Sequence, residues 1–258
     1  MVEFRLNFIK SNVIEIKNEL NSKNIAFEKA EFADWAFCCD VDNNVIEQLD
    51  CYKQGKIYVQ SFSSMMPPVY LEPQANENIL DMCAAPGGKT TQIASMTENK
   101  ALITACELNS VRFEKLKHTI DMQGAKVNIL KQDARNLDSF LKFDKVLLDA
   151  PCSGTGTLEL EKYDFDKWDD TLDALRQIHK KEYLDKIIRT QFKLLQKAID
   201  VTKQGGIIVY STCSVLPEEN EEQIKKILLT KKVKLEKELH INPSNYYEGF
   251  YIAKLIKL

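Results

Sequence analysis

Several kinds of segment are missing from this chain of 258 residues, and each absence excludes a class of protein. No apolar run approaches the roughly 18 residues of a membrane-spanning helix. The opening MVEFRLNFIK is too charged and too short for a signal peptide, so we expect a cytoplasmic protein without a membrane partner. The net charge of −3 gives no sign of a nucleic-acid partner, so any such partner must be held by a local basic patch.

Cysteine pairs of the form C-x-x-C are also absent. The seven cysteines are an odd number, and Cys38 and Cys39 are directly adjacent. Neither a disulfide framework nor a zinc site fits this arrangement, and we expect no bound metal. We interpret Cys51, Cys83 and Cys106 as small buried hydrophobic residues.

The glycine patterns of two nucleotide-binding classes are missing as well. The stretch NILDMCAAPGGKTT at residues 78–91 predicts a buried strand, a tight turn and the start of a helix. A P-loop would need glycine where Cys83 stands, and the dinucleotide fingerprint needs more glycines than the adjacent pair Gly87 and Gly88. The next strand ends at Glu107, twenty positions after Gly87, where doubly wound folds hold a ribose hydroxyl. The stretch therefore predicts an adenosine-type ligand without a pyrophosphate.

Strand-like and helix-like segments alternate after this turn, which predicts an α/β fold with a mostly parallel sheet and an antiparallel last strand from a terminal strand pair. We expect a small N-terminal α+β unit at residues 1–54 and a larger domain at residues 55–258. The expected strands of the sheet span 79–83, 101–106, 127–130, 145–148 and 207–213.

Four local features are further expectations. Ile25–Phe27 is expected to be a strand, and Pro67 with Pro68 a rigid bend that either links or lines the site. One long helical region is expected at about 171–202, ended by Gly205-Gly206.

Acidic side chains follow four of the expected strands, at Asp81, Glu107, Asp133 and Asp149. A single acid at a strand end is more often a cap or a turn former. Four of them at the carboxyl edge of one parallel sheet indicate a ligand site, because ligands of such sheets bind outside that edge.

Two cysteines also follow strand ends. Cys152 precedes a Ser-Gly-Thr-Gly loop, and Cys213 stands between Thr212 and Ser214. If the two strands are neighbours in one parallel sheet, both thiols lie at the ligand edge. Beside an adenosine-type pocket, they indicate covalent chemistry.

The motifs DMCAAPGGKT, LDAPCSGTG and YSTCS, in this order and spacing, closely resemble those of the Sun/RsmB family of RNA cytosine-5 methyltransferases. The resemblance covers nearly the whole chain, from FRLN through VQSFSSMMPP, ACELN and KQDA to EGFYIAKL. It implies a Rossmann-like class I methyltransferase fold, with residues 55–258 as the catalytic domain and the unit at residues 1–54 as an expected RNA contact. It also implies that the protein methylates carbon 5 of cytosine in tRNA or rRNA with S-adenosyl-L-methionine, and we expect it to act as a monomer.

The resemblance assigns the chemistry to the two thiols. Carbon 5 of cytosine is a poor nucleophile, so a thiolate must add to carbon 6 before carbon 5 can take a methyl group. By resemblance Cys213 is the nucleophile and Cys152 assists release of the product. The opposite assignment stays open, because DNA cytosine-5 methyltransferases attack with a Pro-Cys thiol. Asp149 is expected to bind the cytosine edge near N3 and N4, and Lys89 to face the cofactor or the target nucleotide.

The same resemblance implies the cofactor contacts. The main chain of the turn is expected around the methionine part, Glu107 on the ribose and Asp133 near the adenine amino group. The full expected cofactor set is Cys83, Ala84, Ala85, Pro86, Gly87, Gly88, Lys89, Glu107, Arg112, Asp133 and Asp149.

One segment departs from the family pattern. TLELEKYDFDKW at residues 157–168 is more acidic than the resemblance leads us to expect. RNA affinity is therefore expected either to be modest or to depend on basic side chains of the N-terminal part. These are Arg5, Lys10, Lys53 and Lys56.

Two other functions stay open. A catalytically silent RNA-binding relative would be expected to have lost a cysteine or the glycine turn, and this chain keeps both. A redox protein in which Cys152 and Cys213 form a disulfide switch would need neither the glycine turn nor Glu107.

Overall fold

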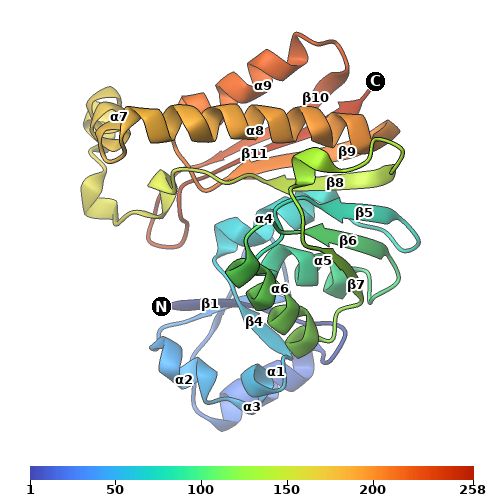
Figure 1. The fold of residues 1–258 in the computed structure, drawn as a ribbon. Helices are drawn as coiled ribbons and strands as arrows, with labels where there is room; N and C mark the ends of the chain where they lie inside the picture. Colours follow the sequence, from blue (N-terminus) through green and yellow to red (C-terminus); the bar gives the residue numbers. More distant parts are fainter.

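The computed structural model describes residues 1–258, except for the side chain of Leu160. The chain forms a four-stranded sheet near the N-terminus and a seven-stranded sheet with helices on both faces (Figure 1). The N-terminal elements are β1 (Val2–Leu6), α1 (Val13–Ser22), β2 (Glu28–Lys29), β3 (Ala36–Cys39), α2 (Asn43–Glu47), α3 (Asp50–Lys53) and β4 (Ile57–Val59).

The larger part follows directly. Its helices are α4 (Phe62–Leu71), α5 (Gly88–Met96), α6 (Ser110–Gln123), α7 (Trp168–Gln177), α8 (Lys181–Val201) and α9 (Glu221–Leu228). Its strands are β5 (Asn78–Asp81), β6 (Leu102–Cys106), β7 (Val127–Leu130), β8 (Phe143–Asp149), β9 (Thr202–Thr212), β10 (Val233–Ile241) and β11 (Phe250–Lys257).

The large sheet runs in the order β10-β11-β9-β8-β5-β6-β7. Strands β5 to β9 are parallel to one another, whereas β11 pairs antiparallel with both β9 and β10. The predicted α/β, Rossmann-like fold with an antiparallel last strand is confirmed. Among the described residues, no helix combines the length and the low charge that crossing a bilayer requires.

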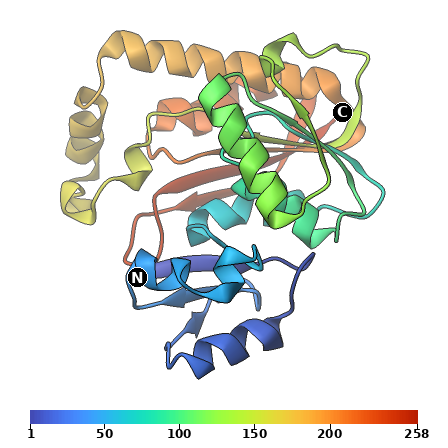
Figure 2. The same ribbon diagram turned by 60° about the horizontal axis from the view of Figure 1, so that its bottom comes forward.

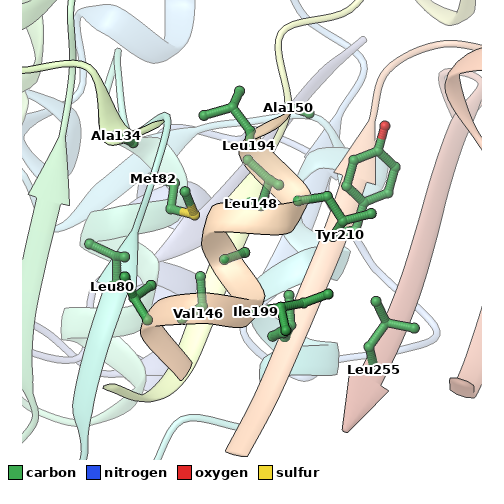
Figure 3. Close-up of a cluster of buried hydrophobic side chains, with 14 of the residues drawn as sticks. Leu80, Met82, Ala134, Val146, Leu148, Ala150, Leu194, Ile199, Tyr210 and Leu255 are labelled. Atoms are coloured by element: carbon green, nitrogen blue, oxygen red, sulfur yellow. The ribbon is translucent and has the colours of Figure 1, made fainter. Parts of the chain in front are cut away.

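The core is divided between the two faces of the sheet. Side chains alternate along a strand, so Val146 and Leu148 of β8 pack in a cluster with Leu194 of α8, as Figure 3 shows. Leu147 points the other way and packs in a cluster with Ile93 of α5. Because α8 and α5 cover opposite faces, both sides of the central strands are apolar and their carboxyl ends are left for the site.

The bend expected at the two prolines is wrong: Pro67 and Pro68 lie inside α4. Ser61 caps this helix by accepting from the N–H of Ser64. Pro68 has no N–H to give to the carbonyl four residues earlier, and the Gln60 side chain donates to that oxygen of Ser64 instead, at 2.9 Å. A side chain thus replaces the missing main-chain bond and the helix continues.

Two expected helix boundaries differ from the observed ones. The region 171–202 is divided into α7 and α8, with a break at Ile178–Lys180. Gly205 and Gly206 do not end α8 but lie in β9. The helix ends at Val201 because Thr202 is already extended, and its hydroxyl donates to the carbonyl of Ala198 at 2.6 Å.

The N-terminal sheet has the order β2-β3-β1-β4 and lies beside the larger part (Figure 2). The strand expected at Ile25–Phe27 is wrong, since the short strand β2 follows it and Ile25 is buried in the core of this unit. Strand β4 pairs with β1, so the sheet takes in residues beyond 54. A division of the chain near residue 54 remains a proposal.

Candidate active site

The carboxyl ends of the parallel strands meet at one edge of the sheet. Asp81 and Asp149 are the last residues of β5 and β8, and Glu107 directly follows β6. Strands β8 and β9 are neighbours, with Asp149 opposite Ser211 in the register. The strands that precede Cys152 and Cys213 are therefore neighbours in one parallel sheet. The loops after β8 and β9 bring both thiols to the same edge.

The glycine turn joins β5 to α5. Gly87 has φ of 113°, a left-handed value that a side chain rarely adopts, and it caps α5, which begins at Gly88. A Cβ on Gly87 would lie 3.0 Å from Thr119 Cβ, and one on Gly88 would lie 2.9 Å from Tyr58. The left-handed φ and the approach of α6 favour glycine at position 87, and the approach of β4 favours it at position 88.

A cavity of about 870 Å³ lies along the edge of β5, β6 and β7. Its lining includes four of the expected cofactor residues that carry charge: Glu107, Arg112, Asp133 and Asp149. Glu107 is 6% exposed; its carboxylate accepts from the N–H of Asn109 at 2.7 Å and lies 3.6 Å from Arg112. The volume is within the range of roughly 300–1,000 Å³ typical of small-molecule and cofactor sites.

The other contacts of these side chains define their orientation. The guanidinium of Arg112 donates to the carbonyl of Ala85 at 2.5 Å and so links α6 to the glycine turn. Asp133 accepts from Arg135 through both carboxylate oxygens, and this partner lowers its pKa. Sequence reasoning did not identify Arg135.

A second cavity, of about 410 Å³, lies between the glycine turn and β4. Three residues line both cavities: Cys83, Asp149 and Cys213. The two spaces therefore meet at one carboxylate and one candidate nucleophile. Two substrates, one in each cavity, would approach each other at this point.

Lys89 lines the smaller cavity, where its ammonium lies 2.8 Å from Asp149 and 2.8 Å from the hydroxyl of Ser64. Burial disfavours its charge, but the negative charge of Asp149 and the hydrogen bond outweigh burial and raise the pKa of Lys89. Ser211 donates to the other oxygen of Asp149 at 2.7 Å. The carboxylate is thus held from both sides with an edge toward the cavities.

The two thiols lie side by side, with their Sγ atoms 3.0 Å apart, and Cys152 lines the larger cavity. The hydrogen bond to Cys213 and burial raise the pKa of Cys152 well above its usual range. A raised pKa favours the protonated form of the Cys152 thiol.

The expected residues of the glycine turn differ in the cavity that they line. Ala84, Ala85, Pro86, Gly88 and Lys89 line the smaller cavity and Gly87 lines neither, so Cys83 is the member of the turn that reaches the larger cavity.

Sequence reasoning assigned no role to several residues of the smaller cavity. Ser64 and Phe250 lie in VQSFSSMMPP and EGFYIAKL, stretches that carried the resemblance but had no assigned function. Tyr58 and Glu248 also line this cavity. Their positions on β4 and in the loop before β11 become neighbours of the turn only in the folded chain.

Four basic side chains were expected to support RNA binding, and for Arg5 this expectation is wrong. Arg5 is completely buried, and its guanidinium donates to Gln60, to the carbonyl of Gly88 and to Thr91, at 2.8 to 2.9 Å. It joins β1 to the glycine turn and cannot reach a phosphate.

The other three basic side chains, all lysines, lie at or near the surface. Each donates to a group of the chain itself: Lys10 to the carbonyl of Met122, Lys53 to that of Gln48, and Lys56 to Glu15. Their participation in RNA binding remains a proposal.

The fold and the edge site define a Rossmann-like class I methyltransferase. A family model described as 16S rRNA methyltransferase RsmB/F matches residues 68–256, and the chain belongs to this family. The resemblance of its motifs is thereby confirmed.

Curated relatives agree with this assignment. The chain is 32% identical over 286 residues to ribosomal RNA small subunit methyltransferase F of Shewanella loihica. The aligned region covers 98% of this chain and 56% of the relative. It is 34% identical over 230 residues to tRNA (cytosine(72)-C(5))-methyltransferase of Pyrococcus horikoshii, and this aligned region covers 83% of this chain and 55% of the relative. The chain thus spans about half the length of these relatives.

A solved structure, a methyltransferase homolog protein from Pyrococcus horikoshii, is similar over 100% of this chain and 86% of its own. Its TM-score is 0.83 and its sequence identity 31%. The similarity includes the N-terminal sheet as well as the large one.

Proposed function

We propose that this protein methylates carbon 5 of cytosine in RNA with S-adenosyl-L-methionine, through a covalent adduct between Cys213 and carbon 6. The observation that carries the proposal is the meeting of two cavities at Asp149 and Cys213. One cavity suits a nucleoside cofactor and the other a single base. A methyl group held in the first would face a base held in the second.

The residues of the larger cavity fit the cofactor. Glu107 has a buried carboxylate that can accept from the ribose hydroxyls, and Asp133 keeps lone pairs that can accept from the adenine amino group. Arg112 would hold the wall of the cavity by its bond to Ala85. S-adenosyl-L-methionine, when bound, supplies an electrophilic methyl group.

The smaller cavity would take the cytosine. Its N3 and N4 edge would lie at Asp149, and the ammonium of Lys89, 2.8 Å from that carboxylate, would favour electron flow toward the ring edge. The Cys213 thiolate would form the Sγ–C6 bond, and the C5–C6 electron pair would then form the new C5–CH₃ bond, while the electron pair of the broken methyl–sulfur bond leaves with S-adenosyl-L-homocysteine. Afterwards the proton on carbon 5 passes to water, its electron pair re-forms the C5–C6 double bond, and the C6–Sγ pair returns to Cys213.

The thiol geometry supports Cys213 as the nucleophile. It lines both cavities, whereas Cys152 lines the larger one. Cys152, whose raised pKa keeps it protonated, would donate a hydrogen bond to the Cys213 sulfur, 3.0 Å away, as that sulfur takes back its electron pair. This bond would assist release of the product.

The substrate is proposed to be tRNA or rRNA, since the relatives' names include both kinds of RNA. A base must leave its stack to enter such a cavity, so a loop or an opened base pair is the expected target. The pair of thiols would also permit a disulfide, but a redox switch would not use the second cavity or its Lys89–Asp149 pair.

The test is covalent trapping. The protein is incubated with S-adenosyl-L-methionine and RNA carrying 5-azacytidine, whose ring nitrogen at position 5 has no proton to lose after methylation, so the adduct persists on a denaturing gel. Wild type is compared with Cys213→Ala and Cys152→Ala. We expect a covalent band that is lost with Cys213→Ala alone.

The other outcomes separate the hypotheses. A band lost with Cys152→Ala alone would exchange the roles of the thiols. No band with wild type on tRNA and rRNA substrates would contradict the proposed function and favour the RNA-binding or redox alternative. Cys51→Ala, which changes a buried thiol of the N-terminal unit, is the matched control and should leave the band unchanged.

A further inference from the structure

Glu219 is a carboxylate with no exposed surface that lies behind the two thiols. It accepts four hydrogen bonds from three different segments: from the N–H and hydroxyl of Ser153 after β8, from the hydroxyl of Ser214 after β9, and from the side chain of Gln191 on α8. Among the described residues, no lysine or arginine forms an ion pair with it. Burial of a carboxylate without a cation is costly, and an apolar side chain would fill the space with less penalty.

Each thiol has neighbours that are tied to this carboxylate. Cys152 stands between Pro151, whose carbonyl accepts from Gln191 at 2.9 Å, and Ser153, whose N–H donates to Glu219 at 2.9 Å. Gln191 in turn donates to Glu219 at 2.8 Å. The loop that carries Cys152 is therefore held on both sides of the cysteine.

The second loop is held in the same way. Cys213 stands between Thr212, whose hydroxyl donates to Asn220 at 2.6 Å, and Ser214, whose hydroxyl donates to Glu219 at 2.7 Å. Asn220 also donates to the carbonyl of Ser214 at 2.9 Å. Adjacent residues of one short segment thus fix the main chain around both sulfurs.

We propose that Glu219 is a positioning residue for the proposed reaction: its carboxylate holds the loops after β8 and β9 so that the sulfurs of Cys152 and Cys213 stay within hydrogen-bond distance. This inference depends on the proposed function, because the separation matters at the release step. There the C6–Sγ electron pair returns to Cys213 while Cys152 donates its hydrogen bond. If the sulfurs move apart, this bond is lost and the adduct persists.

The hydrogen bonds of Glu219 allow the effect of its side-chain length to be separated from the effect of its charge. One oxygen of Glu219 accepts from N–H groups of Ser153 and Gln191, which cannot reverse, and the other accepts from the hydroxyls of Ser153 and Ser214, which can. The amide of Glu219→Gln can therefore keep all partners, with its oxygen toward the N–H groups and its NH₂ toward the hydroxyls. Glu219→Asp keeps the charge but shortens the side chain by one methylene and cannot span both loops.

The experiment compares Glu219→Gln and Glu219→Asp with wild type on unmodified cytosine RNA. For Glu219→Asp we expect kcat to fall on the order of 100-fold, as a displacement of about 1 Å can cause. Its KM for S-adenosyl-L-methionine should be unchanged, and a covalent RNA–protein band should accumulate as with Cys152→Ala. Glu219→Gln should keep kcat within about threefold and accumulate no band. Glu222→Asp, the same change at the start of α9 beside Lys226, is the matched control and should behave as wild type.

The outcomes are separable. A Glu219→Asp enzyme with wild-type kcat and no accumulated band would overturn the inference, and so would a Glu219→Gln enzyme that is impaired while Glu219→Asp is active, because charge would then matter rather than reach. If wild type neither methylates RNA nor forms the 5-azacytidine adduct, the proposed function itself fails. Thermal unfolding and binding of S-adenosyl-L-homocysteine show that each variant is folded. If Glu219→Asp does not fold, Glu219→Gln alone still decides whether the charge of the side chain is needed.

Discussion

Replacing Arg5 by Met should destabilise the protein and leave its RNA electrostatics unchanged. The guanidinium is completely buried and donates to Gln60, to the carbonyl of Gly88 and to Thr91. Methionine fills most of the volume but offers no donor, so these buried acceptors lose a charged partner. Each such loss costs about 1–3 kcal/mol.

The magnitude is moderated by the cost of burying the cation. Burial lowers the pKa of Arg5 to about 9, so removal of the charge relieves part of the desolvation penalty. We expect a net loss of roughly 3 kcal/mol in the free energy of unfolding, at the lower end of the values for broken buried pairs. For a chain of this size that corresponds to a fall of about 6–12 °C in Tm.

The assay is thermal unfolding of Arg5→Met beside Lys23→Met, a matched loss of a surface cation at the end of α1. Lys23→Met should unfold within about 1 °C of wild type, since surface substitutions rarely change stability by more than about 0.5 kcal/mol. An Arg5→Met protein that does the same would refute the reasoning. A decrease in the slope of log K for RNA against log salt by about one would contradict burial, because it would mean that Arg5 contacts a phosphate.

Three further predictions concern other parts of the site and its support. Burial raises the pKa of Glu3 to about 7, so the folded protein binds its proton more tightly than the unfolded chain. The stability penalty is therefore absent below the unfolded pKa near 4.5 and complete above about 7, and Glu3→Gln should raise Tm at pH 8 but not at pH 4.5. Lys89→Met should lower kcat on the order of 100-fold while binding of S-adenosyl-L-methionine, measured by calorimetry, changes little, because Lys89 lines the smaller cavity. A weakening of cofactor binding equal to the loss in kcat would place Lys89 on the cofactor instead. Gly156→Ala should unfold far more easily than Gly205→Ala in urea, since its Cβ would lie 1.9 Å from a main-chain oxygen whereas that of Gly205 meets nothing within 4 Å; equal midpoints would contradict this.

The sequence alone was sufficient for the sheet and for the edge at which the site lies. Alternation of apolar strands with helices, the turn at Gly87-Gly88 and the acids after the strands are local signals with a period of a few residues, and each strand predicted for the large sheet is present. The thiols were expected at this edge only if the strands before them are neighbours, and β8 and β9 do pair in parallel. These features depend on short segments, so they can be inferred from neighbouring residues.

Contacts between distant segments could not be inferred in this way. Arg5 was interpreted as an RNA-binding cation because an exposed and a buried arginine have the same local pattern, and its partners Gly88 and Thr91 are more than eighty residues away. The prolines of α4 were interpreted as a bend because the side chain of Gln60 that replaces their missing bond can be recognised only in the folded helix.

The tertiary structure alone also decided how the site is divided. Glu107 was expected on the cofactor from its place at a strand end, and Lys89 on the cofactor or the target nucleotide from its place beside the turn; the two residues line different cavities. The 3.0 Å separation of the Cys152 and Cys213 sulfurs depends on Glu219, which no motif distinguished from the glutamates around it. Residue type and spacing determine which chemistry is available, but the closure of long loops determines which groups meet, because it depends on packing summed over the whole chain.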